Sequence, residues 1–411
     1  MRLLLGLSVY AAYVQALGAI TAPFFAADLG LDDAKITAIM GFASLGAFGT
    51  AALARLADRH GRRGLVLASF AFLPLFSLAS AIAPGVVSFT LAQVVVNALM
   101  GALFTGIVVA MVEGSSEQWR ARGQAWFGLA CALGGGVAVG MGAVIERVPF
   151  GWRGFWALAA LPALAVPSVR RALGETTRFE LARDAGRTST TRAADLFRGP
   201  WRRRSLALLV VAALRPIALI ATSSWPYYHM VKTLALSPAT ASLVFIAGGT
   251  VGQLGNPLGA RLANGWGRKP AAVWGSLVCV ASGIAFFWVP AGAGAVPLLI
   301  ALSALNQAAS AVFYLVDRLI ATELFPTPLR ATFSGVAGLM VAGAYFVANF
   351  GLSLLVGPLG GLVQAITWLS IVSFVPATVI FLAAVPETRG LSLEESAHEA
   401  PVEDESPLTA E

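Results

Sequence analysis

The chain has 411 residues, of which 57% are hydrophobic and 12% are charged, and its formal net charge is +7. Because soluble domains carry about 25% charged residues, this composition leaves too little polar surface for a water-soluble particle of that length. It excludes a soluble enzyme, a nucleic-acid-binding protein and a secreted disulfide scaffold as first interpretations, and it indicates a protein whose surroundings are the lipid bilayer.

Twelve apolar runs follow one another along the chain, each long enough for the roughly 20 residues that a membrane-spanning helix needs. The predicted spans cover residues 3–26, 36–56, 64–83, 87–112, 124–145 and 154–170, then 205–230, 238–262, 270–289, 296–319, 331–355 and 363–385. The first run begins like a signal peptide, but it continues through Phe24 and Phe25, so we expect it to remain as a span.

Basic residues gather in alternate loops, which predicts the orientation. With both termini in the cytoplasm, 23 of the 28 basic residues lie inside, and Arg215 lies within a span. Only four lie outside: Lys35, Arg147, Arg153 and Lys232. We therefore expect a multi-pass protein of the bacterial inner (plasma) membrane with cytoplasmic ends.

The longest loop separates the sixth span from the seventh. Residues 170–204 hold ten Arg and four acidic residues, and residues 386–411 hold eight acidic residues against one Arg. The predicted organisation is a first six-helix bundle (1–169), a cytoplasmic linker (170–204), a second six-helix bundle (205–385) and an acidic cytoplasmic tail (386–411).

The two halves repeat each other. The segment 54–63 after the second span resembles the segment 260–269 after the eighth, at an offset of 206 residues. Glu113 and Arg122 are echoed by Glu323 and Arg330, and Glu175-Thr176 by Glu387-Thr388, at similar offsets. Three echoes in register predict a six-plus-six duplication, the internal symmetry of secondary transporters.

Five segments carry a family resemblance: 58–63 (DRHGRR), 151–153 (GWR), 226–228 (PYY), 323–330 (ELFPTPLR) and 386–395 (PETRGLSLEE). With them the chain resembles the major facilitator superfamily, and within it the sugar-porter and metabolite:proton-symporter branches. The resemblance implies an all-α membrane protein with twelve transmembrane helices in two pseudo-symmetric six-helix bundles. It also implies alternating access to a central cavity lined by the first, fourth, seventh and tenth spans. The Gly-Pro motif of drug antiporters is absent from the fifth span, which disfavours efflux.

Charged and glycine residues of the repeated motifs are expected at the cytoplasmic ends of the spans. They are Asp58, Arg59, Gly61, Arg62, Arg63, Glu113 and Arg122 in the first half, and Gly267, Arg268, Lys269, Asp317, Glu323, Arg330, Glu387 and Arg389 in the second. Ion pairs among them could latch the inner side shut in one state. The alternative is that they only fix topology and loop folding.

Arg215 is the most informative single residue. It lies ten residues into the seventh span, about 15 Å deep, near the middle of a core about 30 Å thick. A guanidinium at that depth requires a wet cavity or a partner, and its fork suits a carboxylate. Arg215 is therefore either a substrate ligand or half of a structural ion pair.

Polar side chains within spans are the other candidate substrate contacts: Gln93, Asn97, Asn306, Gln307, Tyr314, Tyr227 and Tyr228. Each could instead bond neighbouring helices to one another, and the two tyrosines could belong to an aromatic belt. Glu113 and Asp317 are the candidates for a group that takes up and releases a proton.

We expect a secondary active transporter that moves a small organic anion, a carboxylate, across the inner membrane by proton symport. The alternatives are a sugar, polyol or betaine-like zwitterion carrier, a drug exporter, and a non-transporting membrane sensor. No metal-ligand spacing, phosphate-binding Gly loop or catalytic constellation is visible, so we expect no enzyme activity and no cofactor. The expected partners are a small-molecule substrate, a proton and lipid, with the carrier acting as a monomer.

Overall fold

The structure is a computed structural model that describes residues 1–113, 117–174, 193–198, 201–292, 294–325 and 327–389. All the regular elements in these ranges are helical, which confirms the all-α prediction. The first half contains α1 (Arg2–Asp28), α2 (Asp33–Ser44), α3 (Gly46–His60), α4 (Arg62–Ala81), α5 (Val86–Glu113), α6 (Glu117–Gly142), the short helix η1 (Ile145–Arg147), α7 (Trp152–Leu158), η2 (Leu161–Ala165) and α8 (Val166–Ala172).

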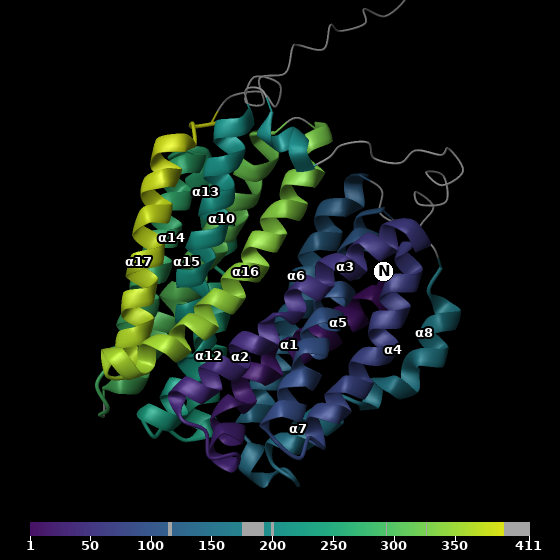
Figure 1. Cartoon of the computed structure of the whole chain (residues 1–411), viewed down its shortest axis with the longest axis vertical. Helices are drawn as coiled ribbons and strands as arrows, with labels where there is room; N and C mark the ends of the chain where they lie inside the picture. Colours follow the sequence, from purple (N-terminus) through teal and green to yellow (C-terminus); the bar gives the residue numbers. More distant parts are fainter. Residues whose placement is uncertain (114–116, 175–192, 199–200, 293, 326, 390–411) are drawn as a thin grey trace, which may run out of the picture.

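The second half has the matching set of helices. It contains η3 (Ala193–Phe197), α10 (Trp201–Ser224), α11 (Pro226–Tyr228), η4 (His229–Thr233), α12 (Pro238–Gly252), α13 (Gly255–Gly265), α14 (Arg268–Phe287), α15 (Ala295–Glu323), α16 (Thr327–Leu359) and α17 (Leu362–Ala384). Figure 1 shows the two halves as two bundles, purple to blue and teal to yellow. The predicted pair of six-helix bundles is thereby confirmed.

Ten helical segments in the described ranges are long and apolar enough to cross a membrane. The second and seventh predicted spans are among these ten and are interrupted only at Leu45 and Trp225. The sixth and the eighth are not among them, so the expectation of one continuous helix is wrong for these two. The sixth consists of α7, η2 and α8, because Pro162 and Pro167 stand in the first turns of η2 and α8, where proline starts a helix and does not continue one. The eighth is split into α12 and α13 between Gly252 and Gly255.

The repeat seen in the sequence has a backbone counterpart. Gly61 precedes α4 with φ 100° and Gly267 precedes α14 with φ 114°. Both values lie in a region that favours glycine over residues with a Cβ. The duplicated motif therefore turns the chain in the same way after the second span and after the eighth.

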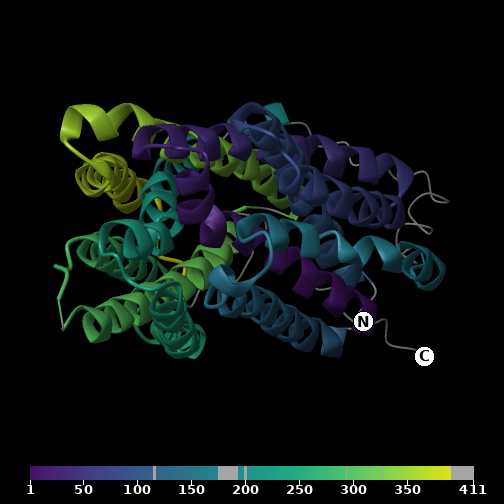
Figure 2. The ribbon, with the colours of Figure 1, turned by 90° about the horizontal axis from the view of Figure 1, so that it is seen from below.

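The two halves converge at one end of the molecule, the lower end in Figure 1, where α2 packs against α16 and α6 against α12. Gly41 permits this approach, because a Cβ there would lie 2.8 Å from the Phe350 nitrogen. Phe42 packs edge-on against Phe346 and Phe350, with ring centroids 6.2 Å and 5.3 Å apart. Figure 2, seen from below, shows the halves side by side. We call this the closed end.

Candidate substrate cavity and gates

A central cavity of about 560 Å³ lies between the halves. Its walls come from α1, α2, α3, α5, α7, α10 and α16, so both bundles contribute. The polar side chains on these walls include the amides of Gln15, Gln93, Asn97 and Asn349 and the phenol of Tyr345. No charged side chain is among the described residues that line the cavity. Its volume falls within the range of small-molecule sites.

Gln93 and Asn97 are held in place by the helix that carries them. They stand one turn apart on α5, and the Asn97 amide donates to the Gln93 backbone oxygen at 2.9 Å. The Gln93 amide donates to the Ser80 hydroxyl at 2.9 Å, which ties α5 to α4. One N–H of each amide is used in this way, which orients the side chain at the cavity wall and leaves the second N–H of each amide for another acceptor.

A second cavity of about 250 Å³ lies within the second half, between α10, α12, α14 and α15. Asn306, Gln307 and Tyr314 line it, and Ser223 lines both cavities, so the two adjoin. The Asn306 amide donates to the Cys279 backbone oxygen at 2.7 Å, and the Gln307 amide donates to the Ser303 hydroxyl at 3.2 Å. The side chain of Asn306 therefore keeps its carbonyl oxygen available to a ligand.

Arg215 lines neither cavity in this conformation. Its side chain is 2% exposed, and its Nη1 lies 3.5 Å from Oδ1 of Asp317, whose side chain is 48% exposed. The guanidinium carbon lies over two aromatic rings, 5.2 Å from the centroid of Phe313 and 4.3 Å from that of Phe381. Neither Nε nor Nη1 has a hydrogen-bond acceptor among the described residues. The structure thus pairs Arg215 of the seventh span with Asp317 of the tenth.

The closed end is fastened by contacts around Asp33. Its Oδ1 accepts a hydrogen bond from the Tyr228 hydroxyl at 2.7 Å and lies 3.6 Å from Nζ of Lys232. That Nζ also donates to the Leu31 backbone oxygen at 3.4 Å. Because Asp33 and Leu31 belong to the first half and the other two to the second, these contacts join the bundles. We call Asp33, Tyr228 and Lys232 the Asp33 latch.

Sequence reasoning did not find the Asp33 latch, because the partner of an acidic residue at the start of a helix cannot be read from that helix alone. Asp32 differs from its neighbour, since it caps α2 by accepting from the Lys35 backbone N–H at 2.8 Å. That hydrogen bond lowers the pKa of Asp32. Among the described contacts, the Tyr227 hydroxyl bonds within the second half, where it lies 3.4 Å from the Pro238 oxygen and 3.4 Å from the Ser242 hydroxyl. Neither Tyr227 nor Tyr228 lines a cavity described above.

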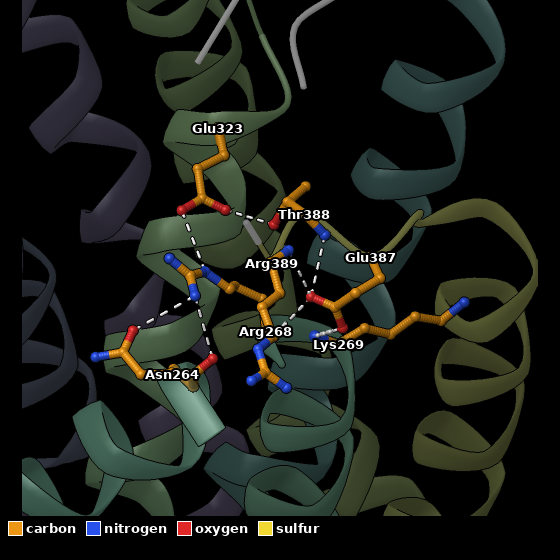
Figure 3. A network of polar contacts seen from close by, with 8 residues as sticks. Asn264, Arg268, Lys269, Glu323, Glu387, Thr388 and Arg389 are labelled. Atoms are coloured by element: carbon orange, nitrogen blue, oxygen red, sulfur yellow. Dashed lines mark hydrogen bonds and ion pairs between the residues drawn. The ribbon is translucent and has the colours of Figure 1, made fainter. Parts of the chain in front are cut away.

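The opposite end of the second half carries a network of charged groups (Figure 3). Arg268 Nε lies 3.3 Å from Glu323, and the other oxygen of Glu323 accepts from the Thr388 hydroxyl. Glu387 accepts from the backbone N–H groups of Arg268 at 2.8 Å and Lys269 at 3.0 Å, so it caps α14. A carboxylate at a helix N-terminus is favourable there. We call this end the network end.

The contacts of the network end that the structure describes lie within single halves. Arg330 donates to the Phe325 oxygen at 2.7 Å, and the Arg389 backbone N–H donates to Glu387 at 3.0 Å. In the first half Arg63 donates to the backbone oxygens of Leu173 at 2.7 Å and Arg170 at 3.0 Å. In this conformation these groups brace each bundle.

The structure does not describe the side chains of three predicted motif residues. The side chains of Asp58, Arg59 and Glu113 lie outside the described residues. The contribution of these three side chains to an ion-pair latch on the cytoplasmic side therefore stays a prediction. Glu113 also stays a prediction as a proton-binding group.

The profile of the Major Facilitator Superfamily matches residues 3–348. Among curated proteins, the chain is 26% identical over 329 residues to the alpha-ketoglutarate permease of Escherichia coli, covering 72% of this chain and 69% of the permease. It is 28% identical over 125 residues to the 3-(3-hydroxy-phenyl)propionate transporter of the same organism, a match that spans 30% of each protein.

Solved structures of similar fold include the xylose transporter XylE from E. coli in its inward-open conformation. It superposes with a TM-score of 0.70 at 18% identity, covering 96% of this chain and 98% of XylE. A mutant form of the nucleoside transporter NupG gives a TM-score of 0.75 at 14% identity, covering 93% of this chain and 100% of NupG. At these identities the likeness concerns the fold.

Proposed function

The chain belongs to the major facilitator superfamily, and from that premise we propose that it is a proton-coupled carrier of a small organic carboxylate. The chain is a transporter and not an enzyme. We propose that the closed end faces outward and the network end faces the cytoplasm, because that orientation follows the basic residues. The conformation is then inward-facing, with the Asp33 latch sealing the outer side and a monomer as the working unit in the inner membrane.

The observation that carries the carboxylate assignment is the buried guanidinium of Arg215. Its Nε and Nη1 have no hydrogen-bond acceptor among the described residues, and its side chain is 2% exposed. Unsatisfied donors on a buried cation are costly, so an acceptor that arrives there is bound strongly. A carboxylate supplies two oxygens in the geometry of the guanidinium fork. Two curated relatives are named for carboxylates, which supports the same substrate class.

A sugar or polyol is the second candidate, and the walls of the central cavity favour it. They offer amides, hydroxyls and one phenol, and no charged side chain among the described lining residues. Such walls suit a ligand with many hydroxyl groups. In that case Arg215 and Asp317 are a structural ion pair. The two candidates make opposite predictions for the removal of Arg215.

Ligand-induced thermal stabilisation of the purified protein separates the two candidates. The panel contains alpha-ketoglutarate, 3-(3-hydroxyphenyl)propionate, D-xylose, glycine betaine and a hydrophobic cation. A ligand at a hundred times its dissociation constant stabilises by about 2.7 kcal/mol. We expect a carboxylate to stabilise the wild type and to leave Arg215→Gln unchanged.

Removal of Arg215 alone leaves the Asp317 carboxylate without its cationic partner, so a loss of stability would be mixed with a loss of binding. The double variant Arg215→Gln/Asp317→Asn removes both charges and serves as the second test protein. If D-xylose alone stabilises the wild type, and both variants respond as the wild type does, the carboxylate assignment is wrong.

A further inference from the structure

A groove lies on the flank of the first half, between the end of α4 and the helix α7. Ile82 lines it at the end of α4, and Arg153 and Ala157 line it from α7, around a volume of about 500 Å³. In Figure 1, α4 and α8 lie on the side of the first bundle that is farthest from the second, and α7 lies at the closed end. Because the described lining residues all belong to the first half, the groove opens toward the surrounding bilayer.

The internal repeat explains how this groove arises. Ile82 follows α4 and Trp288 follows α14, at the same offset of 206 residues as the repeated segments. The indole N–H of Trp288 donates to the Thr367 hydroxyl at 3.0 Å, which ties α14 to the twelfth span, α17. In the first half the smaller, wholly apolar side chain of Ile82 takes the place of that indole. Space is therefore left between α4 and α7, where the sixth span begins.

Apolar side chains surround the groove. Ile82 is 72% exposed, and Phe150, which also lines the groove, is 86% exposed. Phe150 has a φ of 66°, which residues with a Cβ rarely adopt, and such strain is often found at ligand-binding positions. Leu161 and Leu164 of η2 extend the exposed apolar surface beyond α7. In a membrane, the ligand that buries such a surface is an acyl chain.

Two opposite charges stand at the edge of this apolar groove. The Nη2 of Arg153 lies 3.3 Å from Oδ2 of Asp28, and the two side chains are 32% and 49% exposed. The guanidinium carbon lies 4.3 Å from the centroid of the Trp152 ring, and the Trp152 indole N–H donates to the same Oδ2 at 3.2 Å. The Nη1 of Arg153 is buried and has no acceptor among the described residues. The contacts with Trp152 thus hold both charges in place, and one donor of the cation lacks an acceptor.

The two charges indicate which headgroup fits. A phosphate is matched by the guanidinium of Arg153, which binds phosphate oxygens with several donors at once. An ammonium group is matched by the carboxylate of Asp28. A headgroup that carries both charges is therefore complementary to the pair, whereas a purely anionic headgroup meets the Asp28 carboxylate with a like charge.

We propose that this groove binds a phospholipid whose zwitterionic headgroup ends in a primary ammonium. Its phosphate binds Arg153, its ammonium binds Asp28, and one acyl chain lies between α4 and α7 against Ile82 and Phe150. In the orientation proposed above, the lipid belongs to the outer leaflet. The site is separate from both substrate cavities, because its described lining residues line neither of them. The lipid fills in the first half the position that Trp288 fills in the second.

Native mass spectrometry of the full-length carrier, titrated in detergent with one lipid at a time, tests the headgroup assignment. The probes are phosphatidylethanolamine, phosphatidylcholine and phosphatidylglycerol with identical acyl chains. We expect phosphatidylethanolamine to bind about tenfold tighter than the other two, the usual effect of one charged hydrogen bond. Phosphatidylcholine has no N–H on its cation, and phosphatidylglycerol has no cation. Equal binding of the three lipids would overturn the proposal.

The variant Ile82→Trp tests the groove, since it introduces the residue that the second half carries at this position. Val87→Trp is the matched control, because Val87 is 73% exposed and does not line the groove. Both side chains are exposed, so both variants should fold. We expect Ile82→Trp to weaken the binding of phosphatidylethanolamine about tenfold or more and Val87→Trp to leave it unchanged. Equal binding to the two variants would place the lipid elsewhere and contradict the proposal.

The variant Asp28→Asn separates headgroup recognition from a merely structural role of the ion pair. It removes the partner of the ammonium and leaves the positive charge of Arg153 uncompensated. We expect the preference to move from phosphatidylethanolamine to the anionic phosphatidylglycerol. If Asp28→Asn weakens all three lipids by the same factor, Asp28 does not read the headgroup and the assignment is wrong. These results do not depend on which substrate is carried.

Discussion

Gly267 is the residue at which the network end tolerates least change. Its φ is 114°, and a Cβ there would lie 2.6 Å from an oxygen of Glu387. The same carboxylate caps α14 through the backbone N–H groups of Arg268 and Lys269. A side chain at Gly267 therefore strains the backbone and also displaces the cap.

We predict that Gly267→Ala destabilises the protein by about 1–3 kcal/mol, the usual cost of such a strained position. Gly265→Ala is the matched control, because a Cβ there meets no atom within 4 Å. Thermal unfolding of the two variants in the same detergent gives the comparison. Equal melting temperatures for Gly267→Ala and Gly265→Ala would contradict the role assigned to Glu387.

At the scale of helices, the Asp33 latch joins the N-terminus of α2 to α11 and η4. Asp33 accepts a hydrogen bond from Tyr228 at 2.7 Å and faces Lys232 at 3.6 Å. The adjacent Asp32 pairs with Lys35 at 3.5 Å, within the first half. In these contacts Asp33 connects the two halves, whereas its neighbour Asp32 pairs within the first half.

We predict that Asp33→Asn shifts the carrier toward the outward-facing state, because it weakens contacts that hold the halves together at the closed end, which we propose faces outward. Ala342 lines the central cavity, so a Cys at this position can be labelled only when the cavity is open to the reagent. The background protein has Cys131 and Cys279 replaced, so that the new Cys is the thiol that is labelled. An impermeant thiol reagent added outside intact cells should label this site several-fold faster in Asp33→Asn. Asp32→Asn should label at the wild-type rate, and an equal effect of both substitutions would rule out the latch.

At the scale of the whole molecule, hydropathy and local motifs sufficed to predict the architecture. Apolar runs mark each span, and the glycines that turn the chain before α4 and α14 stand in the repeated segments. The division of the sixth span was not predicted, because a count of apolar residues does not register that Pro162 and Pro167 stand in the first turns of η2 and α8. Proline alone is not a sufficient signal, since Pro74 and Pro216 lie inside continuous helices.

The site was predictable only in part. Gln93 and Asn97 stand at the wall of the central cavity, and Asn306, Gln307 and Tyr314 stand at that of the second. Polar side chains within apolar spans, four amides and one phenol, were the signal for them. Which helices pack together is set by side-chain shape across the bundle, so the pairing of residues on α10 and α15 could not be read from either helix alone. Their roles in transport stay predictions.

Uptake of alpha-ketoglutarate into proteoliposomes, driven by an imposed pH gradient, tests the central claim most directly. We predict accumulation above the external concentration when the proton gradient points in the direction of uptake, abolition of that accumulation by a protonophore, and none with Arg215→Gln/Asp317→Asn. D-Xylose should not accumulate. Accumulation of D-xylose without accumulation of any carboxylate in the panel would contradict the account.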